Sequence, residues 1–248
     1  MHIWKGILLT AVCGVVQADH RLEYSETGGG LNVLEVGHQA VRMQQQGESQ
    51  WMLYRHDEKA FYLVDSEQRS YQKMDQSTGQ AMNQQLQALQ AQMEAQLAGM
   101  PPEQREMMKQ MMPKMPGLGQ PVEYTVKPSG DTRKVAGYSC QPVTVFKEGE
   151  PEEELCLGSP KELGIAQNDF ALLKGMGELM SEVAASFGAG SMAAVLEEMD
   201  GLPVEHRAPG AKEPKATLTA SRDAKLDAER FALPAGYSER ELIPGQPQ

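Results

Sequence analysis

The chain has 248 residues, of which 34 are acidic and 23 are basic, so its formal net charge is −11 at pH 7. An acidic surface repels phosphate groups, and the composition therefore argues against binding to nucleic acid or to anionic lipid headgroups. The length allows one large domain or two small ones.

The amino terminus predicts a cleavable signal peptide. The cation Lys5 precedes an apolar run at residues 6–16. That run is shorter than the roughly 20 residues needed to span a bilayer. Residues 16–18 suit the positions that a signal peptidase reads, so we expect cleavage before Asp19.

The predicted signal peptide leads to expectations about lipidation, compartment and domain bounds. A lipid anchor on Cys13 is disfavoured, because Val12 precedes it and the leucines lie too early for a lipobox. We therefore expect a signal peptide over residues 1–18 and a single periplasmic domain over residues 19–243. We expect no transmembrane segment in the mature chain and a disordered tail over residues 244–248.

The segment from Leu31 to Met74 is predicted to be rich in β-strands. Apolar residues gather around residues 33–43, 51–54, 61–64 and 70–74, and short polar connectors separate these runs. Strands joined by such short connectors pair with their sequence neighbours, which predicts an antiparallel meander.

From Ser77 the apolar period changes to that of a helix, and we expect a Met-rich helical insertion over residues 77–116. Five apolar residues recur at helical spacing: Met82, Leu86, Leu89, Met93 and Leu97. Ser77 with Gln80 suggests a capping box at the start, and Gly99 and Pro101 mark the end. A shorter second helix is expected up to Pro113, followed by a linker over residues 116–121.

The two cysteines of the mature chain predict a disulfide. Cys140 lies in an expected strand at residues 135–146, and Cys156 lies in a returning strand after a turn at residues 148–151. A hairpin centred near Glu148 would place the two cysteines opposite each other. An even pair in an exported chain favours a disulfide over a metal site or a reactive thiol. Closing a loop of this length contributes about 3 kcal/mol in the chain-entropy model.

Strands and helices alternate in the second half of the chain. A strand is expected at residues 122–126, before the cysteine hairpin. A wide apolar stripe predicts a helix over residues 170–187, and Ser191 suggests the cap of a further short helix. Strands are expected again at residues 202–207 and 215–222.

Several short motifs, taken in order, resemble a known architecture. They are residues 41–43, residues 61–65 with residues 70–71, residues 135–140, Cys156, and residues 233–237. With them, the order of elements resembles the half-barrel of the periplasmic lipoprotein carriers LolA and LolB. More closely, the chain resembles an uncharacterised bacterial envelope family known only as a domain of unknown function.

The resemblance implies an α+β fold in which a curved antiparallel sheet, a half-barrel, has helices packed on its concave face. It also implies a cavity that can hold an acyl chain or another apolar ligand. Candidate wall residues on the strands are Trp51, Leu53, Phe61 and Leu63, and strand alternation allows only some of them to face inward. Candidate lid residues on the long helix are Met82, Leu86, Leu89 and Met93.

Catalytic patterns are missing from the sequence. The histidines of the mature chain, His20, His38, His56 and His206, stand singly without metal-ligand spacing. No G-x-S-x-G motif is present, and neither Ser139 nor Ser181 has an identifiable base. We therefore expect a protein that is not an enzyme and that needs no cofactor.

The methionines are the unusual feature of the composition, with 16 in the chain. Flexible Met side chains form surfaces that adapt to varied ligands, and they also fill ordinary cores. Soft thioether sulfurs suit Cu(I) in an oxidising compartment. The candidate copper ligands are Met107, Met108, Met111, Met112 and Met115.

The sequence thus predicts a non-catalytic, chaperone-like or binding protein of the periplasm, with an apolar cavity for a lipid or other small hydrophobic molecule. One alternative is a Met-rich protein that handles copper. Another is an interaction module whose exposed helices dock onto a protein partner in the envelope.

Overall fold

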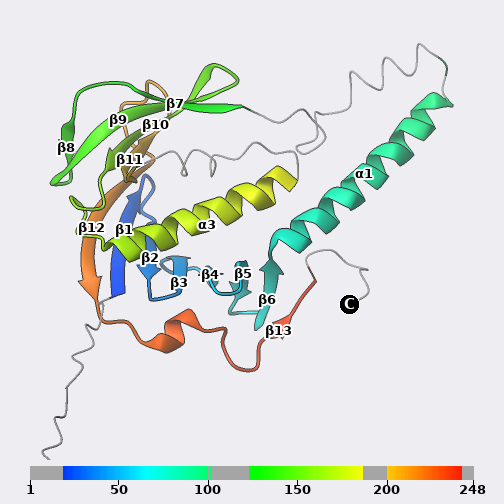
Figure 1. Cartoon of the computed structure of the whole chain (residues 1–248), viewed down its shortest axis with the longest axis horizontal. Coiled ribbons are helices and arrows are strands. Elements are labelled where there is room, and N and C mark those ends of the chain that lie inside the picture. The colour runs from blue at the N-terminus through cyan, green and yellow to red at the C-terminus, as the bar shows by residue number, and fades with distance from the viewer. Residues whose placement is uncertain (1–18, 100, 102–122, 187–199, 242–248) are drawn as a thin grey trace, which may run out of the picture.

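The computed structural model describes residues 19–99, 101, 123–186 and 200–241. Within these residues, thirteen strands form one large open sheet, almost all of it antiparallel (Figure 1). The strand order is β13-β6-β5-β4-β3-β2-β1-β12-β11-β10-β9-β7, and β8 pairs with β9. The α+β class with a large antiparallel sheet is thereby confirmed.

The predicted meander forms one half of the sheet. Its strands are β2 (Leu31–Val36), β3 (Ala40–Gln45), β4 (Gln50–Arg55), β5 (Ala60–Asp65) and β6 (Ser70–Met74). Each pairs antiparallel with the next, as predicted. Sequence reasoning missed β1 (Asp19–Glu26), which pairs with β2, because Leu22 and Tyr24 are its only apolar residues.

The other half of the sheet contains the cysteine hairpin. Its strands are β7 (Tyr124–Pro128), β8 (Arg133–Val135), β9 (Tyr138–Lys147), β10 (Glu150–Gly158), β11 (Leu202–Arg207) and β12 (Ala216–Ala224). The short strand β13 (Ser238–Glu239) belongs to the meander half, where it pairs parallel with β6. Pairing of β1 with β12 joins the two halves into a continuous sheet. The strand expected at residues 135–146 is confirmed as β9 from Tyr138 onward, but its start is wrong. Ala136 and Gly137 have positive φ angles and turn the chain between β8 and β9.

The predicted disulfide between Cys140 and Cys156 is confirmed, with Cα atoms 5.3 Å apart. The two residues are not directly opposite, as the hairpin centred on Glu148 required. Cys156 pairs with Pro142, because the turn is centred between Glu148 and Gly149 and the register shifts by one further residue between Pro151 and Glu153. The disulfide therefore joins β9 and β10 across a diagonal.

Two long helices accompany the sheet. They are α1 (Gln76–Ala98) and α3 (Gln167–Ser186), and a short 3-10 helix, η1 (Ala228–Phe231), lies near the carboxyl end. The helix α1 packs against α3 and β6. Its amino-terminal cap is Asp75, whose side chain accepts from the backbone N–H of Thr78 at 3.0 Å. The expected cap Ser77 lies in the first turn and donates its hydroxyl to Asp75 instead.

Other predictions fall outside the described residues. They are the signal peptide at residues 1–18, the second Met-bearing helix and its linker, the helix after Ser191, and the tail over residues 244–248. None of the described helices combines the length and the apolar character needed to cross a membrane.

The helix α3 covers one face of the meander. A row of side chains from four adjacent strands, Val36, Val41, Tyr54 and Phe61, is at most 2% exposed. These residues form a core cluster with Leu172, Leu173, Met176 and Leu179 of α3. Because helical spacing places these four apolar residues of α3 on one side, the helix buries that side against the row.

The carboxyl-terminal segment covers the opposite face. Trp51, Leu53, Tyr62 and Val64 form a second cluster there, and Phe231, Leu233 and Tyr237 pack against it. The carboxylate of Glu35 is fully buried on this face. It accepts from Arg21 at 2.9 Å, from Arg42 at 3.3 Å and from Arg230 at 2.8 Å. Arg230 belongs to η1, so this cluster fastens the carboxyl-terminal segment to the sheet.

Replacing Glu35 should destabilise the protein strongly. The substitution Glu35→Gln removes the charge that compensates three guanidinium groups, and breaking a buried ion pair in this way costs about 3 kcal/mol. Urea unfolding of the purified protein measures the loss. Glu67→Gln, at an exposed position, is the control and should change the free energy of unfolding by less than about 0.5 kcal/mol. Equal stability of the two variants would contradict the structural role of Glu35.

The cap of α1 should make stability depend on pH. Burial raises the pKa of Asp75, but hydrogen bonds from Ser77 and Thr78 and the contact with Lys73 outweigh it and lower that pKa to about 2. A lowered carboxyl pKa stabilises the fold above about pH 4, and the contribution is lost as the pH falls toward 2.

The variant Asp75→Ala should therefore lose about 1 kcal/mol at pH 7. Its deficit relative to the native protein should shrink as the pH falls from 4 to 2. Asp75→Asn, which keeps an acceptor oxygen without the charge, should lose less at pH 7. Urea unfolding at a series of pH values tests this, and a deficit independent of pH would contradict it.

Candidate apolar binding site

A second row of side chains lies beside the row that α3 buries. Leu34 pairs with Met43, Met43 with Met52, and Met52 with Leu63, so these four residues follow one another across β2 to β5. Unlike the neighbouring row, all four are only partly buried. They form the floor of a cavity and are called the floor row.

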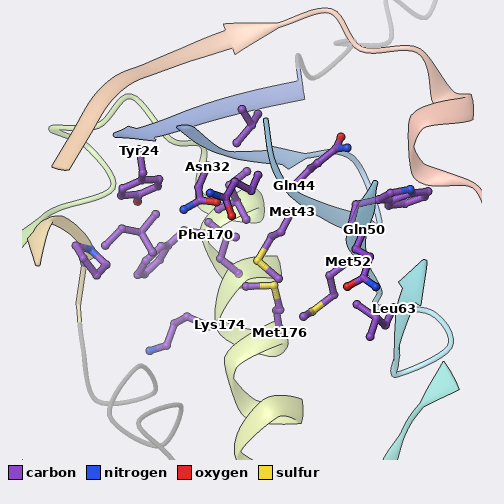
Figure 2. A pocket seen from close by; sticks show the side chains of 18 residues that line it. Tyr24, Asn32, Met43, Gln44, Gln50, Met52, Leu63, Phe170, Lys174 and Met176 are labelled. Atoms are coloured by element: carbon purple, nitrogen blue, oxygen red, sulfur yellow. The ribbon is translucent and has the colours of Figure 1, made fainter. Parts of the chain in front are cut away.

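The cavity lies alongside α3 and has a volume of about 520 Å³. Small-molecule sites in proteins occupy roughly 300–1,000 Å³, so a ligand of moderate size fits. Phe170, Leu173, Lys174 and Met176 of α3 form one wall, as Figure 2 shows for Phe170, Lys174 and Met176. Tyr24 and residues 201–203 border the cavity as well.

Polar side chains form the outer rim. Asn32 and Gln45 are paired across β2 and β3, and each lies two residues along its strand from a residue of the floor row. Gln50 also borders the cavity. Burial raises the pKa of the Tyr24 hydroxyl far above its ordinary value, so Tyr24 remains a neutral phenol at physiological pH. An apolar floor with an amide rim suits an amphiphilic or apolar ligand.

Three thioethers reach this cavity from three elements, β3, β4 and α3. Met43 and Met52 are cross-strand neighbours, and Met176 comes from α3. Figure 2 shows the three side chains turned toward the same space. Met side chains adjust their shape readily, so this part of the lining can adapt to ligands of different outline.

The expected wall residues divide between the two faces of the sheet. Trp51 and Leu63 are among the residues that line the cavity. Leu53 lies in the cluster under the carboxyl-terminal segment, and the ring of Trp51 also packs there, 4.6 Å from the guanidinium carbon of Arg42. Phe61 is buried beneath α3 with its ring 5.3 Å from that of Tyr54. Neither Leu53 nor Phe61 lines the cavity, because each belongs to a filled core.

The expected lid residues lie on α1 and are not among the residues that line this cavity. Met82, Leu86 and Met93 are partly buried, and Leu89 is 43% exposed. The candidate copper ligands, Met107, Met108, Met111, Met112 and Met115, lie outside the described residues.

Sequence reasoning did not select Asn32, Met52, Lys174 or Met176 as site residues, and it used Met43 only to mark a strand. Period-two alternation shows that Met43 and Met52 could each face a ligand. It does not say which of the two faces carries the cavity.

One polar cluster brings together the residue types of a hydrolytic triad. The ring of His20 lies 2.8 Å from the hydroxyl of Ser221 and 3.3 Å from the carboxylate of Asp223. The hydroxyl of Ser221, however, donates to the backbone carbonyl of Leu163 at 2.6 Å. A hydroxyl whose proton is already committed in this way is not poised as a nucleophile. The cluster therefore fastens β1 to β12 and to the loop before α3.

A protein usually holds a metal ion with several His, Cys, Asp or Glu side chains that lie close together. In the part of the chain that the structure describes, no three His, Cys, Asp or Glu side chains are grouped so that they could hold a metal ion.

The fold and the site together define a class: an open antiparallel sheet with an apolar cavity between one face and a covering helix. The chain belongs to the family described as domain of unknown function DUF4412, whose model matches residues 56–237. The expectation of an uncharacterised family is confirmed by this match. No curated protein matches the chain.

Solved structures give a distant likeness. PNGF-II in the C2 space group matches with 10% identity and a TM-score of 0.42, over 92% of this chain and 31% of that one. PNGF-II in the P21 space group matches with 9% identity and a TM-score of 0.41, over 91% and 32%. The chain thus spans about a third of the length of these proteins.

Proposed function

We propose that this protein is a non-catalytic binding or chaperone-like protein of the bacterial periplasm that holds a lipid or another apolar ligand in the cavity beside α3. One observation carries the proposal. The floor row consists of four large apolar side chains that remain partly exposed in a cavity of about 520 Å³. Leaving such a surface in contact with water costs about 25 cal/mol for each square ångström, so a ligand that covers it gains this free energy.

The architecture proposed with this function is the LolA/LolB-like half-barrel. The covered face of the meander would be its concave face, with α3 as the helix that closes the cavity on one side. The order of elements supports it: a meander, a long helix, the cysteine hairpin, a second helix and returning strands. An export signal at residues 1–18 and the Cys140–Cys156 disulfide fit an oxidising compartment.

A charged side chain in the floor row should weaken the binding of apolar ligands. In the variant Met52→Glu, a ligand in the cavity would have to remove water from a carboxylate, which should weaken binding by at least tenfold. The measurement is titration of the mature protein with Nile red, a neutral fluorophore whose emission reports an apolar site. Native mass spectrometry before and after organic extraction would identify a ligand that co-purifies.

The matched control is Met180→Glu. Met180 is a partly exposed methionine of α3, 37% exposed, that does not line the cavity. It should bind Nile red as tightly as the native protein. Equal loss of binding in the two variants, or no binding by the native protein, would contradict the proposal.

Binding of Cu(I) is a second candidate, favoured by the convergence of Met43, Met52 and Met176. Thioether sulfur is a soft ligand that prefers Cu(I). Met176→Leu keeps an apolar side chain of similar volume but removes one sulfur. Competition with a chromophoric Cu(I) chelator should show about tenfold weaker binding by this variant than by Met180→Leu. Identical affinities would exclude this trio as the copper site.

A further inference from the structure

Lys174 brings a positive charge to the apolar cavity. It stands on α3, between Phe170 and Met176, and is partly buried (Figure 2). Among the described residues that line the cavity, it is the only one with a charged side chain.

The ammonium group of Lys174 is unpaired among the described residues. Within the described residues, its side chain forms no ion pair or hydrogen bond. Glu178 follows Lys174 by one turn of α3, and Asp200 precedes the cavity residue Gly201. Neither pairs with Lys174. A cation beside an apolar surface without a counter-charge is available to an anionic group of a ligand.

The lining of the cavity spans five adjacent strands. Its lining includes Tyr24 of β1, Leu34 of β2, Met43 of β3, Met52 of β4 and Leu63 of β5. Adjacent strands lie about 4.8 Å apart, so these five residues extend over roughly 19 Å. Such a shape suits an extended chain better than a compact ring system.

The volume agrees with one hydrocarbon tail. A cavity of about 150 Å³ holds the six carbons of benzene. By this scale, the volume of about 520 Å³ holds roughly 20 carbons. That is the size of a single long alkyl chain.

We propose that the ligand is an unbranched long-chain carboxylic acid, with its alkyl tail along the floor row and its carboxylate at Lys174. This inference rests on the proposed function, because it names the ligand class of the same cavity. One ammonium group balances the single charge of a carboxylate. A phosphate monoester carries more charge and is usually bound by several cations, often arginines.

The neutral amides of the rim are consistent with this assignment. Asn32 and Gln50 each donate one hydrogen bond, to Glu26 and Asp65, and every side-chain amide has a second N–H that can meet a ligand without supplying charge. The long stem of Lys174 can lie along the apolar wall while its ammonium group reaches the headgroup. The chain as a whole has a net charge of −11 and therefore repels anions. Lys174 is the group in the described cavity lining that attracts one.

The test compares a fluorescent fatty acid with its methyl ester on the full mature chain. The probes are 11-(dansylamino)undecanoic acid and its methyl ester at pH 8, where the acid is ionised. We expect the acid to bind the native protein about tenfold more tightly than the ester, as for a partly buried charged contact. Added salt should weaken binding of the acid and leave the ester unchanged.

Variants assign the difference to Lys174. Lys174→Met should lose the preference for the acid while its affinity for the ester stays within about twofold. Lys174→Arg should retain the preference, because it retains the charge. Lys161→Met, at an exposed position before α3, is the control and should behave as the native protein.

The outcomes separate the two proposals. Equal affinity of the native protein for acid and ester would overturn the role of Lys174 and leave the apolar cavity intact. Failure of both probes to bind would overturn the proposed function together with this inference. A preference for the acid that persists in Lys174→Met would place the headgroup elsewhere and overturn the assignment.

Discussion

The packing of α3 across the meander is the contact on which the arrangement of the site depends. Side chains on one face of a strand recur every second residue, so successive rows across the sheet lie about 6.6 Å apart. A helix with its side chains is about 10–12 Å wide and cannot cover three such rows. The helix α3 buries the row of Val36, Val41, Tyr54 and Phe61, and the floor row beside it stays partly exposed.

The opposite face is closed in a different way. The carboxyl-terminal segment lies over Trp51, Leu53 and Tyr62, and the cluster of Glu35 with three arginines fastens it. The ring of Trp51 packs against Arg42, a member of the same cluster. This face therefore combines an apolar core with a buried, fully paired carboxylate. The difference between the two faces explains why the site borders α3 and why Leu53 is a core residue.

The lining of the cavity combines an adaptable surface with one fixed charge. Methionines from two strands and one helix allow the apolar part to fit chains of varied outline. Lys174 lies on α3, whose buried side packs on the sheet. It places a positive charge in the wall of the cavity that α3 forms. Together they favour a ligand with one apolar tail and one anionic end. The family to which the chain belongs has no assigned function, so the site itself carries the functional argument.

Local patterns in the sequence determined the strands of the meander, the hairpin with its disulfide, the helix α3 and the end of α1 at Gly99. Each follows from alternation, helical spacing, turn residues or a cysteine pair, which act over a few residues. Only the tertiary structure decided which face of each strand meets α3, because alternation defines two faces without ranking them. The tertiary structure also placed β1 at the centre of the sheet, made Asp75 the cap of α1, and arranged Lys174, Met43 and Met52 around one cavity. These features depend on contacts between residues far apart in the chain, which no local pattern encodes.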